Sequence, residues 1–298
     1  MAVVGGWRRL ALLKAARQAD VIVVLRKFFI PVFCRLLRNK NRRLILDLDD
    51  ALFADENGTR SPKRERSFVG MARHVDTVWA GNNYLSQAAL PFCPKTTVLP
   101  TSVETSKYNQ RIGPSGDFFD VVWIGSSSTR KYLESLLPIL GRAVREIPSL
   151  RLKIIADFDL PAAVGLGVPT FAVPWSSASE AAELASAHVG VAYMPDDPWT
   201  RGKCGLKVLQ YMAAGLPVIA SATGVHREII VDDQTGFLTS DEAGWLAALR
   251  QLRFAASMRR LMGDAGRQRV MERYSVSATF DKMLASLETL TGPDDRIR

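Results

Sequence analysis

Short runs of β-branched and aliphatic residues alternate along the chain with stretches of helical periodicity. The apolar runs are nearly continuous, which is typical of strands that are buried on both faces of a parallel sheet. Alternation of such strands with helices predicts an α/β fold. The expected strands are Val21–Leu25, Leu44–Leu48, Thr77–Ala80, Thr96–Leu99, Val121–Ile124, Leu152–Ala156, Thr170–Val173, Val189–Tyr193 and Val218–Ala220.

A polar, turn-rich stretch between Thr105 and Asp120 interrupts this alternation and predicts a domain boundary. We expect two Rossmann-like, doubly wound domains that face a cleft, with ligands at the carboxyl ends of the strands. The predicted bounds are 1–110 for the N-terminal domain and 111–275 for the C-terminal domain. A helical segment follows at 276–298. About four strands precede the boundary, fewer than a Rossmann-like set, so the N-terminal domain is expected to be truncated.

The segment from Gly202 to Glu228 reads GKCGLKVLQYMAAGLPVIASATGVHRE. A turn at Gly205 opens a helix, whose apolar face is expected to carry Leu206, Leu209, Met212 and Ala213. The free N–H groups at a helix N-terminus bind anions, and Lys207 and Gln210 add a cation and an amide. This arrangement suits a nucleoside-diphosphate sugar. The alternative is an ordinary amphipathic helix packed on a sheet.

A second candidate turn follows the strand that begins after Asp120. The strand ends at Gly125, and a helix is expected to start near Thr129. Hydroxyl and N–H groups of this turn could hold a phosphate, with Lys131 as a cation in the first helical turn. A capped helix without a ligand is the alternative. The residues expected to contact the nucleoside-diphosphate sugar here, which we call the donor, are Gly125, Ser126, Ser127, Thr129 and Lys131.

Composition agrees with a soluble globular protein, since 47% of the 298 residues are hydrophobic and 23% are charged. The cysteines Cys34, Cys93 and Cys204 are odd in number and widely spaced. They therefore predict neither a disulfide framework nor a zinc site, and they fit a reducing cytosol. For Cys204, a small packed thiol is a simpler interpretation than a nucleophile.

The positive charge is concentrated at the N-terminus. Residues 1–45 contain eleven Lys and Arg residues, and Asp20 is the one acid among them, within a chain of net charge +9. Basic and apolar residues alternate over residues 7–43, beginning at Trp7. This pattern favours contact with an anionic membrane surface, although a basic outer face of an ordinary domain explains it equally well. No nucleic-acid motif, transmembrane segment or signal peptide is expected.

The run YMAAGLPVIAS within the Gly202–Glu228 segment resembles the donor-binding signature of GT-B glycosyltransferases, in particular the retaining family called group 1 or GT4. That signature usually has two acidic residues eight positions apart. Here Gly202 and Gln210 stand in their places, and the chain resembles a subset with a GKC entry. The segments LILDLDDALF, VDTVWAGNNYLSQAA and TTVLPTSVETSKYN are similar to N-domain segments of these enzymes.

The resemblance implies roles for further residues. Lys131 matches a lysine that meets the diphosphate, whereas Ser126 stands where an arginine is usual, so that Lys207 or Arg130 would have to compensate. The loop after Thr170 would hold the nucleobase through Val173 and Trp175, before a helix capped near Ser176 or Ser177. The last helix would cross back to the first domain. The donor-contact set implied around the glycine turn is Lys203, Cys204, Gly205, Leu206, Lys207 and Gln210.

The segment Asp47-Leu48-Asp49-Asp50 permits a metal-binding interpretation, because hard cations favour carboxylates. Its place in a GT-B-like region instead predicts Asp49 and Asp50 as catalytic cleft carboxylates that face the acceptor or the donor sugar, with no metal. A capping or turn role is the structural alternative.

Together these features predict a cytoplasmic glycosyltransferase, peripheral at the inner face of the membrane. It would move a sugar from a nucleoside-diphosphate-sugar donor to a hydroxyl of a glycan or lipid-linked acceptor, with retention and without metal or other cofactor. Cell-envelope polysaccharide or glycolipid synthesis is the expected setting. A catalytically degenerate nucleotide-sugar-binding protein and a metal-dependent Asp-x-Asp enzyme, built on Asp47 and Asp49, are the alternatives.

Overall fold

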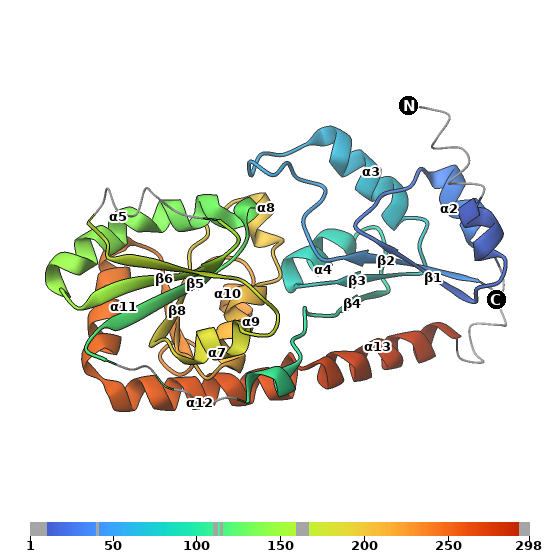
Figure 1. The fold of residues 1–298 in the computed structure, drawn as a ribbon. Coiled ribbons are helices and arrows are strands. Elements are labelled where there is room, and N and C mark those ends of the chain that lie inside the picture. The colour runs from blue at the N-terminus through green and yellow to red at the C-terminus, as the bar shows by residue number, and fades with distance from the viewer. Residues whose placement is uncertain (1–10, 40–41, 110–112, 114–115, 159–166, 292–298) are drawn as a thin grey trace. The chain divides into compact units, whose positions relative to one another are not determined.

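The computed structural model describes residues 11–39, 42–109, 113, 116–158 and 167–291. The chain forms two compact units, each built on its own parallel sheet (Figure 1). Unit 1 contains Met1–Thr101, Asp197–Cys204 and Phe280–Arg298, and unit 2 contains Ser102–Asp196 and Gly205–Thr279. Several segments used in the sequence analysis lie outside the described residues. They are 7–10, which includes Trp7, residues 40–41, parts of the expected linker (110–112 and 114–115) and the end of the expected last segment (292–298).

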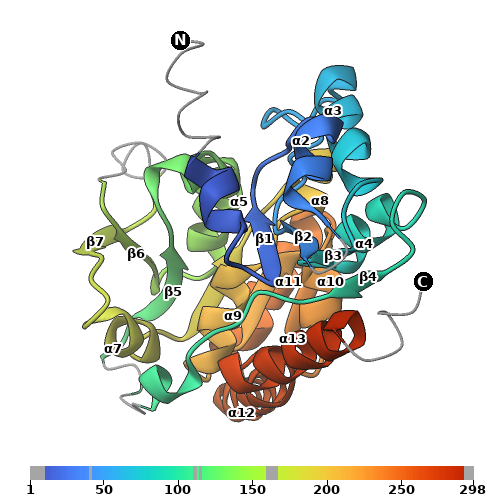
Figure 2. The same ribbon diagram turned by 90° about the vertical axis from the view of Figure 1, so that its right-hand side faces the viewer.

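Unit 1 is a four-stranded sheet in the order β1-β2-β3-β4, with every pair parallel. Helices α2, α3 and α4 pack on one face, and the later part of α13 packs on the other through Met283, Leu287 and Leu290 (Figure 2). The elements are β1 (Val21–Leu25), α2 (Pro31–Leu37), β2 (Arg43–Leu48), α3 (Pro62–Ala72), β3 (Thr77–Ala80), α4 (Asn83–Ala89), β4 (Thr96–Val98), α8 (Pro198–Arg201) and α13 (Val276–Thr291).

Unit 2 is a six-stranded parallel sheet in the order β10-β9-β8-β5-β6-β7. Its strands are β5 (Phe119–Ile124), β6 (Leu150–Ala156), β7 (Thr170–Pro174), β8 (Val189–Ala192), β9 (Val218–Ser221) and β10 (Gly236–Thr239). Its helices are η1 (Thr105–Tyr108), η2 (Ser127–Thr129), α5 (Arg130–Glu146), α7 (Glu180–Ala185), α9 (Leu206–Ala213), α10 (His226–Ile229), α11 (Glu242–Phe254) and α12 (Ala256–Arg273).

Alternate residues of β5 build two cores in unit 2. Val121 and Trp123 face α5 and α11, whereas Val122 and Ile124 face α9 and α12. Because a strand with both faces buried needs apolar residues at every position, this explains the continuous apolar run seen in the sequence. The strand order reverses between β5 and β8, so the carboxyl ends of these two strands mark the topological switch point where α/β sheets bind ligands.

The structure confirms the predicted α/β class and the nine predicted strands. It adds β10, which the pattern missed because only Phe237 and Leu238 of its four residues are apolar. The helix expected to be capped near Ser176 or Ser177 begins at Glu180 instead, with Ser179 at its N-cap position. Leu206, expected on the buried face of α9, is 47% exposed. Tyr108, expected in a polar linker, is buried in the core of unit 2.

Candidate functional site

The turn after β5 and the N-terminus of α9 lie next to each other in unit 2. The side chain of Lys207 connects them, because its Nζ donates a hydrogen bond to Thr129 Oγ1 at 3.0 Å. The same ammonium lies 4.6 Å from the centroid of the Trp123 ring, a cation–π contact. It also lies against Gly125, where a Cβ atom would stand 2.5 Å from Nζ. The two predicted donor turns therefore lie side by side.

Both helix starts lack a side-chain cap. Gly205, the N-cap residue of α9, has φ 69° and no side chain to cover the amides that follow. At the other turn, Ser126 and Ser128 bond each other through their hydroxyls at 2.9 Å, and Thr129 N–H donates to the Ser126 carbonyl. The first-turn N–H groups of a helix have no partner within the helix. Such a pair of N-termini beside a cation is suited to an anion.

The cation at this junction is Lys207, one of the two compensating residues left open by the sequence. The other, Arg130, bonds Glu134 one turn along α5 through its Nε at 2.7 Å. Lys131 is exposed and lies 5.2 Å from the centroid of its neighbour's ring, Tyr132. Lys207 therefore contacts both predicted turns, whereas Lys131 lies exposed in the first turn of α5.

A second polar group in unit 2 converges on the carboxylate of Glu180. Gln210 Nε2 donates to Glu180 Oε1 at 2.9 Å, and Trp175 Nε1 donates to Oε2 at 2.7 Å. The Tyr108 hydroxyl also donates to Oε1. Burial, followed by the bond to Glu180, raises the pKa of Tyr108, so its proton stays on the phenol. Val173 lies at the end of β7, paired with Ile155.

Sequence reasoning missed Glu180 and Tyr108. Tyr108 stands in a stretch with the composition of a solvated linker, and its burial arises from tertiary packing. Glu180 follows Trp175 by five residues, in the first turn of a helix whose start was placed too early. An acid in the first turn of a helix is also common for purely electrostatic reasons, so the pattern offered no distinct signal.

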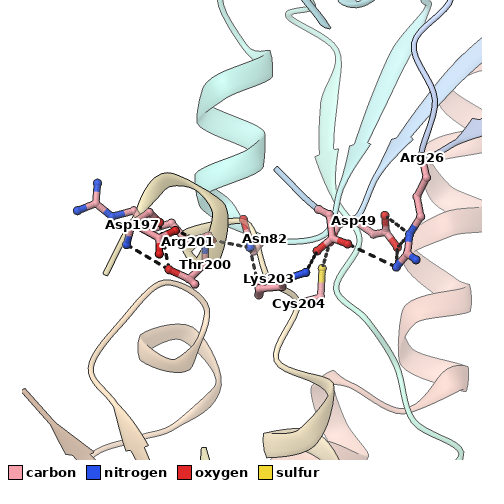
Figure 3. Close-up of polar contacts among 9 residues, drawn as sticks. Arg26, Asp49, Asn82, Asp197, Thr200, Arg201, Lys203 and Cys204 are labelled. Atoms are coloured by element: carbon pink, nitrogen blue, oxygen red, sulfur yellow. Dashed lines mark hydrogen bonds and ion pairs between the residues drawn. The ribbon is translucent and has the colours of Figure 1, made fainter. Parts of the chain in front are cut away.

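Unit 1 brings together the remaining predicted residues, Asp49, Asp50, Lys203 and Cys204. Figure 3 labels Asp49, Lys203 and Cys204. Arg26 donates to both carboxylate oxygens of Asp49, at 2.6 and 2.8 Å, and Lys203 Nζ donates to Asp50 Oδ1 at 2.9 Å. The hydrogen bond to Asp49 is the largest of the effects that raise the pKa of Arg26. Asp49 and Asp50 are thus each paired with a cation. The segment that ends in Lys203 and Cys204 belongs to unit 1, whereas Gly205 begins the part in unit 2.

Asn82 fixes the position of this segment within unit 1. Its Nδ2 donates to the carbonyls of Arg201 and Lys203, at 3.1 and 2.9 Å, while its Oδ1 caps α4 by accepting from Leu85 N–H (Figure 3). The side chain is fully buried. Since each polar atom of the amide has a partner, its orientation is determined and the segment is held without a helix or strand of its own.

Gly202 packs so closely against Ala51, in the turn that follows β2, that no side chain fits at this position. A Cβ atom there would stand 2.4 Å from Ala51 Cβ and 2.5 Å from Ala51 N. The first acidic residue of the usual signature could not be accommodated at Gly202 without moving this backbone. The packing of unit 1 therefore requires a glycine at this position.

The titratable groups beside Lys203 have distinct chemistry. Cys204 Sγ donates to the Asp49 carbonyl at 2.7 Å, and burial, with the charges of Asp49 and Asp50, raises the pKa of its thiol to about 12. A thiol that stays protonated at neutral pH is a poor nucleophile, which favours the packed role. Burial, and secondarily Asp49, raises the pKa of Asp47 to about 6. Over the ranges that the structure describes, no three His, Cys, Asp or Glu side chains are grouped so that they could hold a metal ion.

The two parallel α/β units have the fold of the GT-B glycosyltransferases. A solved structure of Anabaena Alr3699/HepE in complex with UDP and glucose matches 95% of this chain and 81% of its own, with a TM-score of 0.71 and 16% identity. Residues 119–253 match the family described as "Glycosyl transferases group 1". This part of the chain, which contains Lys207, Gln210 and the turn after β5, matches that family, and the resemblance found in the sequence is confirmed.

Curated relatives are similar over a longer stretch. EpsD of Bacillus subtilis (strain 168), which carries the name of a glycosyltransferase, is 29% identical over 189 residues, covering 61% of this chain and 48% of EpsD. D-inositol 3-phosphate glycosyltransferase of Geodermatophilus obscurus is 25% identical over 214 residues, covering 64% of this chain and 47% of that protein. The chain thus spans about half the length of the curated relatives that it matches.

Proposed function

We propose that this protein is a glycosyltransferase that moves a sugar from a nucleoside-diphosphate-sugar donor to an acceptor hydroxyl. The observation that carries the proposal is the bond from Lys207 to Thr129, which joins two open helix N-termini at the switch point of a parallel sheet. A departing diphosphate would meet backbone N–H groups, serine hydroxyls and one ammonium there. Electrostatic stabilisation of the leaving group is the largest contribution that such a site can make to catalysis.

Retention and metal independence are part of the proposal. The leaving phosphate would help to take the acceptor proton in a front-face attack, so that no strong protein base is required. Lys207, with Lys131 at the edge, would neutralise the diphosphate in place of a divalent ion. Asp49 and Asp50 are proposed to contact sugar hydroxyls. Their pairing with Arg26 and Lys203 suits hydrogen-bond acceptors of fixed position better than nucleophiles.

The acceptor is proposed to be a lipid-linked or cell-envelope glycan, reached at an anionic membrane surface. Helix α2 supports this, because Val32 and Leu36 are 61% and 56% exposed beside the exposed Arg35. An exposed apolar face with neighbouring cations fits the interface of a bilayer. Among the described residues, no helix combines the length and hydropathy needed to span a membrane. A cytoplasmic location at the inner membrane face belongs to the same proposal.

A thermal-shift panel of UDP, GDP and ADP sugars, each with and without EDTA, tests the donor class. The proposal expects one nucleotide family to raise the unfolding temperature equally in both conditions. A shift that requires a divalent ion would instead support the Asp-x-Asp alternative. Nucleotide binding without sugar release or transfer would support the degenerate binding protein, an alternative favoured by the glycine at Gly202 and the amide at Gln210.

A further inference from the structure

We propose that Glu180 is a positioning residue: it orients the Gln210 side chain so that its carbonyl oxygen accepts hydrogen bonds from the ribose hydroxyls of the nucleotide. This inference rests on the proposed function and deepens it. A ribose contact at Gln210 is what the resemblance to the group 1 enzymes implies, and the new element is that Glu180 orients the amide that would make it. The assignment follows from the polar group that converges on Glu180.

The orientation of the Gln210 amide is fixed by chemistry. A carboxylate has only acceptor atoms, so the atom of Gln210 that lies 2.9 Å from Glu180 Oε1 must be the nitrogen, Nε2. Oε1 of Gln210 is then directed away from Glu180. Among the described residues, no group donates a hydrogen bond to this oxygen, and the side chain is half-buried. Gln210 therefore presents an uncharged acceptor.

Glu180 is itself held in place by two further donors. Trp175 Nε1 bonds Oε2 at 2.7 Å, and the Tyr108 hydroxyl bonds Oε1. Because the pKa of Tyr108 is raised by burial and by this carboxylate, the phenol remains a donor. Three donors from separate elements thus fix one carboxylate, which in turn fixes Gln210. A rigid supporting residue of this kind improves the geometry of a binding contact.

The location of Gln210 agrees with a ribose contact. Gln210 stands three residues after Lys207 on α9, so both side chains lie on one side of the helix near its N-terminus. Its partner Glu180 also bonds Trp175, the candidate for the nucleobase. The Gln210 amide is therefore placed between the diphosphate end and the base end of the site. In a nucleotide, the group between these two ends is the ribose.

The test compares the affinity of the full chain for a nucleoside diphosphate with that for its 2′,3′-dideoxy counterpart, using whichever of UDP, GDP and ADP binds. In the parent protein the hydroxyls are expected to contribute about tenfold. Glu180→Gln releases the amide orientation, and Gln210→Glu places two carboxylates together, so each is expected to remove most of that preference. The double variant Glu180→Gln/Gln210→Glu exchanges the two groups, and it is expected to recover affinity to within about threefold of the parent.

Rescue by the double variant is a result that a purely structural role for Glu180 would not produce. Gln210→Leu supplies a second test that leaves Glu180 unchanged, and it should lose the ribose preference to the same extent. The matched control is the pair Gln268 and Glu272 on the exposed face of α12, which makes the same amide-to-carboxylate bond at 2.8 Å. Gln268→Glu and Glu272→Gln should leave both affinities unchanged.

An unchanged ribose preference in Glu180→Gln, or a double variant that binds no better than either single variant, would overturn the assignment. These outcomes leave the proposed function intact, because the parent still binds its nucleotide. If the parent protein binds none of the three nucleoside diphosphates, the proposed function fails and the role of Glu180 fails with it.

Discussion

The Lys207 side chain contacts both Thr129 and the Trp123 ring, so its charge is held between the two predicted donor turns. Lys207→Ala removes that charge without disturbing the buried face of α9. We expect it to weaken nucleoside-diphosphate binding by about 1–3 kcal/mol, the range for losing a hydrogen bond to a charged group. Titration calorimetry measures the change. Lys131→Ala should also weaken binding.

The exposed Lys282 on α13 provides the matched control, and Lys282→Ala should bind like the parent protein. Equal affinity in the parent, Lys207→Ala and Lys131→Ala would remove both lysines from the site.

His226 makes the free energy of unfolding depend on pH. It is buried, its Nδ1 lies 3.0 Å from the Ser221 carbonyl, and burial lowers its pKa to about 4. Its pKa in the unfolded chain is about 6.5. Between these values the unfolded chain binds more protons than the folded one, so the free energy of unfolding falls as the pH falls from about 6.5 towards 4.

His226→Asn should reduce this dependence, because asparagine keeps a donor near Ser221 and does not titrate. The measurement is the unfolding temperature of both proteins from pH 7 to pH 4. A slope that is identical in the parent and the variant would show that His226 does not contribute. His188, whose pKa burial also lowers to about 4, is expected to keep part of the slope in the variant.

At the scale of elements, the segment Asp197–Cys204 depends on Asn82. Asn82→Ala removes a helix cap and the bonds to the carbonyls of Arg201 and Lys203, which should cost about 2–4 kcal/mol in the free energy of unfolding. Urea unfolding measures this loss, and limited proteolysis should show earlier cleavage within the segment. The exposed Asn57, whose side chain bonds Thr59, is the control. If Asn57→Ala lowers the free energy of unfolding as much as Asn82→Ala does, the anchoring role of Asn82 is contradicted.

The elements also show what the sequence could and could not predict. Apolar runs identified nine strands. Those of β3, β5, β8 and β9 follow from burial on both faces, whereas β1, β4 and β7 are only partly buried. The glycines of the sequence also predicted the turns at Gly125 and Gly205. The pairing of Lys207 with Thr129, and the division of the donor signature after Cys204, depend on tertiary packing and have no local signal. The same holds for Arg26, a basic residue in a basic stretch whose bond to Asp49 only the fold reveals.

For the whole molecule, the uneven charge predicts binding to anionic vesicles. Cations of the N-terminal region would contact lipid phosphates while Val32 and Leu36 enter the interface. We expect the protein to co-sediment with vesicles of phosphatidylglycerol and phosphatidylcholine, more weakly as salt increases. Val32→Ser/Leu36→Ser should reduce the bound fraction, whereas Leu261→Ser on the exposed face of α12 should not. Equal binding to uncharged vesicles would contradict an electrostatic contribution.

Titration calorimetry of the parent protein with a nucleoside diphosphate and with the matching monophosphate, each in EDTA, tests the central claim most directly. Two helix N-termini joined by Lys207 should hold the second phosphate, so the diphosphate is expected to bind at least about tenfold more tightly. EDTA should leave that advantage unchanged. Equal affinities, or an advantage that appears only when a divalent ion is added, would contradict the account.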